Sequence, residues 1–292
     1  MSTTRSAPTA EESGRATPYR GARIAVGTRH GKQHQFSAAF AEVLGAELVT
    51  PPDLDTDQFG TFSGEHPRVL SALEAARAKA ALAIEATGQP CGLASEASYG
   101  PLPGSGVPGH EEVLLFCDTV RGIEILEGYR STAVPGSRHR VTRIEELPAS
   151  LLEGLTRQAV IVRPEARFDG IIKGVTGIDD LRAAIAAAAA AADTGAAIVE
   201  PDLRAHHNAS RREVLRRLAR TVAERLATAC PSCGCPGFGR VDTRRGLPCR
   251  VCAAPTGLPR SEIHACPACG HTRTRPVSDA RADPRDCPDC NP

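Results

Sequence analysis

Apolar and polar residues follow strand and helix periods through the first part of the chain. Residues 23–26 form a short β-branched run, and after a polar loop at 27–32 apolar residues recur at helical spacing up to residue 45. A second short run at 47–49 precedes an acidic loop, and a long helical pattern covers 67–88, with proline first and glycine last. This order of strand, helix, strand and helix predicts an α/β domain.

The same alternation continues into the middle of the chain. Short apolar runs at 91–95, 113–117 and 123–129 predict strands, the last two joined by an Arg-Gly turn. Residues 160–162 predict another strand, and a helix is expected from Asp179 through a run of alanines. The resulting order of strands and helices, β, α, β, α, β, β, β, α, indicates a mixed α/β sheet flanked by helices.

Composition divides the chain into segments around this sheet. Residues 1–20 are polar and rich in Ser, Thr, Pro and Glu, so we expect a disordered tail. Residues 21–200 form the α/β domain, which is expected to bind a nucleotide. Residues 201–228 are expected to be a linker loop and an amphipathic helix, which begins at the capping box formed by Ser210 and Glu213.

Nine of the eleven cysteines lie in the last segment, residues 229–292. Eight of them form four C-x-x-C pairs: Cys230 with Cys233, Cys249 with Cys252, Cys266 with Cys269, and Cys287 with Cys290. Spacers of 15 and 17 residues separate the first pair from the second and the third from the fourth, which is typical of zinc ribbons. We therefore expect tandem four-cysteine ribbons holding two structural zinc ions. Spacing leaves open whether the pairs interleave, and whether Cys235 replaces a ligand or is spare.

Charge and hydropathy exclude several classes of protein. The formal net charge is +1, so no global field attracts nucleic acid or a membrane surface. The most apolar run, Ala183–Ala192, is too short to span a bilayer, so no membrane is expected as a partner. The polar N-terminus lacks the apolar core of an export signal, and we expect a cytoplasmic protein with reduced thiols.

The loop Gly27-Thr28-Arg29-His30-Gly31-Lys32 is the first candidate site. It lies where a strand gives way to a helix, so backbone amides and the helix dipole favour an anion there. Thr28, Arg29, His30 and Lys32 are the residues we expect to contact a phosphate. The loop is not a Walker A motif, because it has one residue fewer between its glycines and Gln33 follows the lysine.

Acidic residues follow this loop in the sequence. Asp57 and Glu65 lie in the loop after the second strand, and Glu96 follows the third strand. Carboxylates beside a phosphate site suit Mg²⁺, which neutralises phosphate charge, so these three are candidate catalytic residues. Arg204 and His206, just before the last helix, either close over the phosphate or form a polar loop that caps that helix.

Four motifs resemble the inosine-triphosphate-pyrophosphatase-like superfamily, which includes the Maf and non-canonical purine types. They are Gly27-Thr28 to Lys32, the acidic loop with Thr61-Phe62, Glu74-Ala75-Ala76-Arg77-Ala78-Lys79-Ala80, and Leu93-Ala94-Ser95-Glu96. The resemblance covers residues 23–129 and implies magnesium-dependent hydrolysis of nucleoside triphosphates. It implies further that Lys32 and Lys79 hold phosphates, that Asp57 or Glu65 binds the metal, and that Glu96 binds metal or activates water.

The whole chain is also similar to an uncharacterised bacterial family known as a domain of unknown function. Together these features predict a magnesium-dependent hydrolase of a nucleoside triphosphate or another phosphate-bearing substrate, with structural zinc ribbons. The alternative is a non-catalytic protein whose ribbons bind nucleic acid or a protein while the α/β domain only senses a ligand. In a third arrangement, the ribbons deliver the enzyme domain to a nucleic-acid end.

Overall fold

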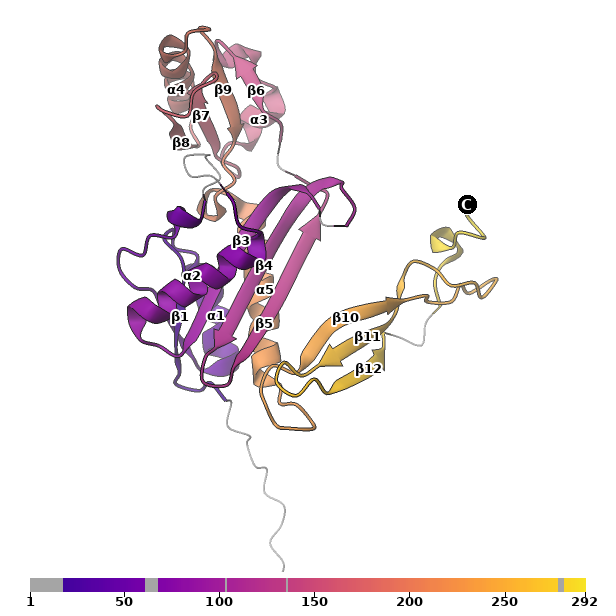
Figure 1. The fold of residues 1–292 in the computed structure, drawn as a ribbon. Helices are drawn as coiled ribbons and strands as arrows, with labels where there is room; N and C mark the ends of the chain where they lie inside the picture. Colours follow the sequence, from indigo (N-terminus) through magenta and orange to yellow (C-terminus); the bar gives the residue numbers. More distant parts are fainter. Residues whose placement is uncertain (1–17, 61–67, 103, 135, 278–280) are drawn as a thin grey trace, which may run out of the picture.

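A computed structural model describes residues 18–60, 68–102, 104–134, 136–277 and 281–292. It contains a five-stranded sheet, a four-stranded sheet and a three-stranded sheet, the first two flanked by helices (Figure 1). The mixed α/β class is therefore confirmed. Within the α/β domain expected over residues 21–200, the strands divide between two separate sheets.

The first sheet has the strand order β2-β1-β3-β4-β5. Its strands are β1 (Arg23–Val26), β2 (Glu47–Val49), β3 (Cys91–Pro101), β4 (Pro108–Asp118) and β5 (Ile123–Ser131). β1 is parallel to both of its neighbours, whereas β3, β4 and β5 form an antiparallel meander. The long meander strands extend well beyond the apolar runs that predicted them, because polar residues continue the pairing at their ends.

Helices cover both faces of this sheet: α1 (Gln33–Leu44) and α5 (Ala209–Ala227) on one, and α2 (Ala72–Thr87) on the other (Figure 1). The side chains of β1 alternate between these two faces. Ile24 and Val26 join the core under α1 and α5, whereas Ala25 packs with Ala83 of α2. After β1 the chain passes through α1 on one face of the sheet, and before β3 it passes through α2 on the other face. The carboxyl end of β1 is a topological switch point, where α/β sheets bind ligands.

Helix starts differ from the sequence prediction. The long helix begins after Ser71, whose hydroxyl and the Glu74 carboxylate form a capping box, rather than near Pro67, which lies outside the described residues. The last helix is capped by Asn208 rather than by Ser210. Asn208 has extended backbone and accepts from the Arg211 amide at 3.0 Å, so the cap falls two residues earlier.

The second sheet is inserted between β5 and α5, in the order β6-β9-β7-β8, with antiparallel pairing throughout. Its elements are β6 (His139–Val141), α3 (Ala149–Gly154), β7 (Val160–Pro164), β8 (Ile172–Val175), α4 (Ile178–Ala191) and β9 (Ala197–Pro201). The alanine run forms most of α4, which buries Leu181, Ala184, Ile185 and Ala188 against the sheet. The second sheet and its helices therefore bury a hydrophobic core separate from that of the first sheet.

Packing gives more detail on two segments predicted from the sequence. The amphipathic helix expected within residues 201–228 is α5, and its Leu215, Leu218 and Val222 join the core of the first sheet. The tail expected over residues 1–20 ends earlier, since Tyr19 is buried and its hydroxyl donates to Asp118 Oδ2 at 3.0 Å. The rest of that expectation, residues 1–17, lies outside the described part of the chain.

The cysteine-rich segment forms the third sheet, which extends away from the α/β body (Figure 1). β10 (Gly239–Arg245), β11 (Pro259–Ala265) and β12 (Thr272–Pro276) are antiparallel in that order. Four 3-10 turns complete the described elements: η1 (Asp57–Phe59), η2 (Ile144–Glu146), η3 (Ala205–His207) and η4 (Pro284–Asp286). Among the described residues, none of the helices combines the length and the apolar character needed to cross a bilayer.

Candidate functional site

A cavity of about 90 Å³ lies at the carboxyl end of β1, at the switch point of the first sheet. Nine residues proposed from the sequence line it: Thr28, Arg29, His30, Lys32, Asp57, Lys79, Glu96, Arg204 and His206. They come from the β1–α1 loop, η1, α2, β3 and the segment before α5. Glu65, the remaining candidate, lies outside the described residues. We call this cavity the anion pocket.

The floor of the anion pocket depends on a close approach between β1 and α2. A Cβ atom at Gly27 would lie 2.2 Å from the carbonyl oxygen of Lys79, so only glycine fits. Beside it, the buried Thr28 hydroxyl accepts from the amides of His30 and Lys32, each at 3.4 Å. These bonds curl the loop so that successive side chains face the cavity.

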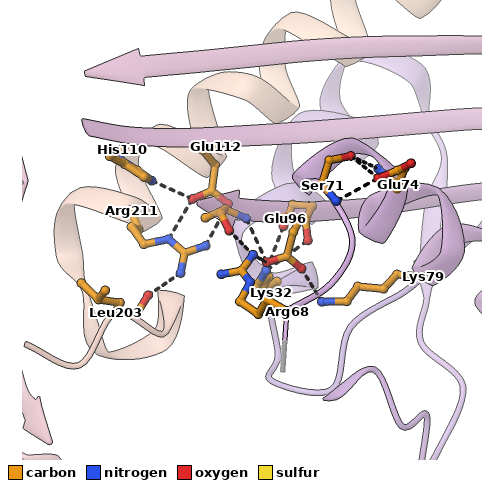
Figure 2. A network of polar contacts seen from close by, with 12 residues as sticks. Lys32, Arg68, Ser71, Glu74, Lys79, Glu96, His110, Glu112, Leu203 and Arg211 are labelled. Carbon is orange, nitrogen blue, oxygen red and sulfur yellow. Dashed lines mark hydrogen bonds and ion pairs between the residues drawn. The ribbon is translucent and has the colours of Figure 1, made fainter. Parts of the chain in front are cut away.

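Glu96 is buried between cations at the wall of the pocket (Figure 2). Its Oε2 forms an ion pair with Lys79, and its Oε1 accepts from Arg68 Nη2 at 3.0 Å. Burial raises the pKa of Glu96, but Lys32, Lys79 and Arg68 outweigh it and hold the pKa at about 2. The carboxylate is therefore ionised, and both of its oxygens are occupied.

Lys32 has a different environment. Its Nζ donates to the carbonyl oxygen and the hydroxyl of Ser95, both at 3.2 Å. Burial lowers the pKa of Lys32 to about 8, although Glu96 opposes the change. Both of these partners are neutral oxygens, so a second anion near Nζ would restore the preference for the charged amine.

A buried ion pair adjoins the pocket. Arg211 donates from Nε and Nη2 to the two oxygens of Glu112, at 2.8 and 2.9 Å, and a third bond goes to the Leu203 carbonyl (Figure 2). His110 Nε2 lies 3.3 Å from Glu112 Oε2. Both Glu112 and Arg211 are almost fully buried, and Arg211 also lines the anion pocket.

Sequence reasoning missed Arg68, Glu112 and Arg211. One signal was available: Arg211 precedes Leu215 by four residues and Leu218 by seven, so it falls on the apolar face of the last helix. A charged residue on a buried face requires a buried partner. Nothing local identifies that partner as Glu112, because it lies 99 positions earlier in the chain.

Two histidines and an aspartate also line the pocket. Asp57 accepts from Arg29 Nη1 at 2.9 Å, and its other oxygen lies 3.2 Å from His30 Nε2. The His30 ring lies 5.3 Å from that of His206. Burial lowers the pKa of His30, and burial together with His207 and Arg204 lowers the pKa of His206 to about 4. Both imidazoles are thus neutral at pH 7.

The acidic residues do not fit a magnesium site as they are placed. Both oxygens of Glu96 and both of Asp57 are engaged by basic side chains. Outside the cysteine pairs, no three Asp, Glu, His or Cys ligands converge among the described residues. A divalent cation would have to displace a basic side chain before it reached Asp57 or Glu96.

The cysteines form two groups of four, and within each group the sulfur atoms all lie within 4.8 Å of one another. One group is Cys230, Cys233, Cys266 and Cys269; the other is Cys249, Cys252, Cys287 and Cys290. Four of the sulfur pairs are 3.5 to 3.9 Å apart. Tetrahedral Zn–S bonds of about 2.3 Å place sulfurs roughly 3.8 Å apart, so both groups fit structural zinc.

The pairs interleave, the first with the third and the second with the fourth, instead of forming tandem ribbons. Sheet pairing gives the reason. Gly239 of β10 faces Ala265 of β11, which brings Cys266 back to the first knuckle. Ser261 of β11 faces Pro276 at the end of β12. The chain therefore leaves β12, on its way to the fourth cysteine pair, near the second pair.

All four knuckles share one turn. The residue after each pair donates its amide to the carbonyl of the first cysteine, and in order these donors are Gly234, Ala253, Gly270 and Asn291. Cys235 belongs to neither group of four; its carbonyl accepts from the Cys230 amide and its side chain packs beside Phe238. Among the described cysteines it is therefore a packing residue of the first knuckle.

Comparison with known proteins assigns a family without assigning an activity. No curated protein and no solved structure matches the chain. The model of one family, described as a domain of unknown function (DUF6671), matches residues 79–292, which is well over half of the chain. The match includes Lys79, Glu96 and all eight paired cysteines, and it begins after the Gly27–Lys32 loop. The chain belongs to the DUF6671 family.

Proposed function

We propose that the α/β body binds the phosphate group of a small molecule, such as a nucleotide, in the anion pocket. One observation carries the proposal: among the described residues that line the cavity, six are basic and two are acidic. The basic ones are Arg29, Lys32, Lys79, Lys173, Arg204 and Arg211. Cations gathered in a partly desolvated cavity favour an anion, because water no longer screens their repulsion.

Lys32 strengthens this proposal. Its amine donates to two neutral oxygens of Ser95, and burial, Arg211 and Lys79 together lower its pKa although Glu96 and Glu112 oppose the change. A phosphate oxygen at Nζ would add negative charge there and favour the charged amine. Arg29 and Arg204 add planar guanidinium groups, which bind phosphate in a bidentate manner. The cavity holds about one phosphate group, so the remainder of a larger ligand would lie outside it.

Hydrolysis of the bound phosphate is the second candidate function. The observation that favours it is the His30–Asp57 pair, a neutral imidazole whose Nε2 lies 3.2 Å from a carboxylate at the edge of the pocket. An imidazole in this state accepts a proton from water attacking phosphorus. The resemblance of residues 23–129 to the inosine-triphosphate-pyrophosphatase-like superfamily favours a nucleoside triphosphate as substrate. Magnesium does not fit the present positions of Asp57 and Glu96, so no step is assigned to it.

The non-catalytic alternative assigns the main interaction to the zinc tail. Residues 229–292 carry nine arginines and six acidic residues, and two tetrathiolate zinc sites would add about four negative charges. The zinc-loaded tail then has no excess of positive charge. Of the two partners considered for it, a protein is therefore favoured over nucleic acid.

A ligand panel tests the proposal. The zinc-loaded full chain is mixed with inorganic phosphate, pyrophosphate, and canonical and deaminated nucleoside mono- and triphosphates, with and without magnesium. Thermal shift reports binding, and phosphate or pyrophosphate release reports turnover. We expect stabilisation by at least one phosphate compound, lost in Lys32→Met and retained in Arg77→Met, a surface variant with the same charge change.

A further variant distinguishes turnover from binding. Asp57→Asn should abolish any product release while retaining most of the thermal shift, because it removes the carboxylate beside His30 but leaves Lys32 and Lys79 in place. Release that persists in this variant contradicts the hydrolytic mechanism. A thermal shift that is absent across the whole panel contradicts phosphate binding itself.

A further inference from the structure

Asp202 lies at the junction of the two α/β sheets, where the chain leaves β9 and returns toward α5. Its side chain is fully buried. Oδ1 accepts from the Arg204 amide and from Arg204 Nε, both at 3.0 Å. Oδ2 accepts from Arg204 Nη2 at 2.6 Å and from the amide of Gly174 at 3.1 Å. One carboxylate thus holds a side chain of the segment before α5 and a backbone corner of β8.

The backbone of Asp202 is itself fixed. Its amide donates to the Ala159 carbonyl at 2.8 Å, and its own carbonyl accepts from Gln158 Nε2 at 2.8 Å. The β8 corner is equally constrained, because Gly174 has φ of 73° and a Cβ there would lie 2.7 Å from His207 Nε2. The carboxylate therefore has little freedom to follow its partners if they move.

Both partners of Asp202 lead to the anion pocket. Arg204 lines the cavity, and so does Lys173, the residue before Gly174. These two cations come from outside the five-stranded sheet and its first two helices, which supply Lys32, Lys79 and Glu96. Asp202 does not line the cavity among the described residues.

On the basis of the proposed function, we propose that Asp202 is a positioning residue of the anion site. It holds Arg204 and the Lys173–Gly174 corner at the mouth of the pocket, so that the inserted sheet supplies one wall of a site whose floor belongs to the first sheet. Fixing a guanidinium before the ligand arrives reduces the entropy lost on binding and directs its remaining N–H groups at the anion.

Asp202→Asn tests this inference, because asparagine keeps the size of the side chain and one acceptor but loses the charge and one acceptor. Affinity for inorganic pyrophosphate is measured by calorimetry on the zinc-loaded full chain. We expect the variant to bind about tenfold more weakly. Asp118→Asn is the matched control: Asp118 is also buried and accepts from Arg121, but at the far end of the sheet, and it should leave the affinity unchanged.

A double-mutant cycle separates positioning from general support of the fold. If Asp202 acts through Arg204, adding Asp202→Asn to Arg204→Gln should weaken binding little beyond Arg204→Gln alone. Losses that add in full, or an Asp202→Asn variant with the affinity of the natural chain, would overturn the inference.

A signal independent of ligand distinguishes this inference from the proposed function. The Nε–H resonance of Arg204 should be sharp and slow to exchange in the free protein, and should exchange rapidly in Asp202→Asn. A protected signal that survives the substitution, or one that is unprotected in the natural chain, contradicts positioning by Asp202. If pyrophosphate fails to bind the natural chain while the signal behaves as expected, the proposed function fails and Asp202 still positions Arg204.

Discussion

The anion pocket and the zinc tail both concentrate charge, but they assemble it in opposite ways. The pocket gathers residues spread from Thr28 to Arg211, joined by contacts between distant parts of the chain. In the tail, each knuckle is a local turn of a few residues, repeated four times between Cys230 and Asn291. Local turns can be identified from spacing, whereas a cluster built by tertiary packing requires the packing to be known.

The two regions also balance their charge differently. Each cysteine group offers four sulfur ligands, which could hold a zinc ion without any other residue of the chain. In the pocket, carboxylates such as Glu96 and Glu112 neutralise some of the basic residues, and the positive excess remains at the cavity. We therefore expect the tail to need a metal ion and the pocket to need an anion.

Zinc stoichiometry gives the largest expected effect. The interleaved pairing predicts that Cys230→Ser with Cys269→Ser loses one zinc ion, while Cys230→Ser with Cys249→Ser loses both. Structural zinc contributes about 10–16 kcal/mol to zinc-finger peptides at pH 7, so the affected part of the tail should unfold. Metal analysis after gel filtration checks this. Cys235→Ser should retain both ions, and a remaining ion in Cys230→Ser with Cys249→Ser contradicts interleaving.

The buried ion pair comes next. Glu112→Gln leaves Arg211 charged and incompletely paired in the core, which should cost about 3–5 kcal/mol of the free energy of unfolding. Urea unfolding of the α/β body measures the loss. The exposed pair Arg77–Glu124 is the comparison, and Glu124→Gln should cost under about 1 kcal/mol. Equal losses of unfolding free energy in the two variants would contradict the expectation that the buried ion pair is the more costly one to break.

Gly27→Ala tests the close approach of β1 and α2. The added methyl would meet the Lys79 backbone, so strand and helix must separate, at a cost of about 1–3 kcal/mol. Thermal unfolding measures the change, and anion affinity should fall with it because Lys79 moves. Gly88→Ala, where the space is open but φ is 66°, gives the cost of the backbone conformation alone. Gly27→Ala should therefore weaken anion binding while Gly88→Ala does not.

The pH dependence of anion binding sharpens the description of the pocket. Lys32 binds an anion in its protonated form, and its pKa of about 8 in the free protein means that this form disappears as pH rises through 8. Glu96 and Glu112 favour the charged amine, while Arg211 and Lys79 disfavour it. Sulfate, which stays doubly charged in this range, should bind about tenfold more weakly at pH 9 than at pH 7. Lys32→Met should not bind sulfate at either pH, and a flat profile in the natural chain contradicts this role of Lys32.

The smallest effect concerns the start of α5, the helix that carries Arg211 to the pocket. Asn208→Ala removes the side-chain oxygen that accepts from the Arg211 amide and should cost about 1 kcal/mol. Thermal unfolding checks the loss. Ser210→Ala should cost less, because Ser210 lies inside the helix; the reverse order would support the capping box that the sequence predicts.

Sequence reasoning succeeded where the signal is local. The strand at 23–26, the helix after Lys32 and the eight paired cysteines follow from short-range periodicity and spacing. Several pocket residues were proposed because they lie in the loop between a strand and a helix, or follow the next strands along the chain. The division into two sheets could not be predicted, because strands of both sheets have the same period and only their pairing separates them.

The partners inside the site were equally beyond local signals. Glu96 meets Lys79 and Arg68 through the packing of α2 on β3, and Glu112 meets Arg211 across 99 positions of sequence. Cysteine spacing predicted the candidate ligands, yet strand pairing in the third sheet decides which of them come together. In each case the missing information is the register of one element on another.

Calorimetric titration of the zinc-loaded full chain with inorganic pyrophosphate at pH 7 measures anion binding by this cavity. We expect saturable binding at one site, lost in Lys32→Met and unchanged in Arg77→Met, with both variants folded as judged by circular dichroism. Absence of binding to the natural chain, or equal binding by Lys32→Met, would contradict the assignment of this cavity as an anion pocket.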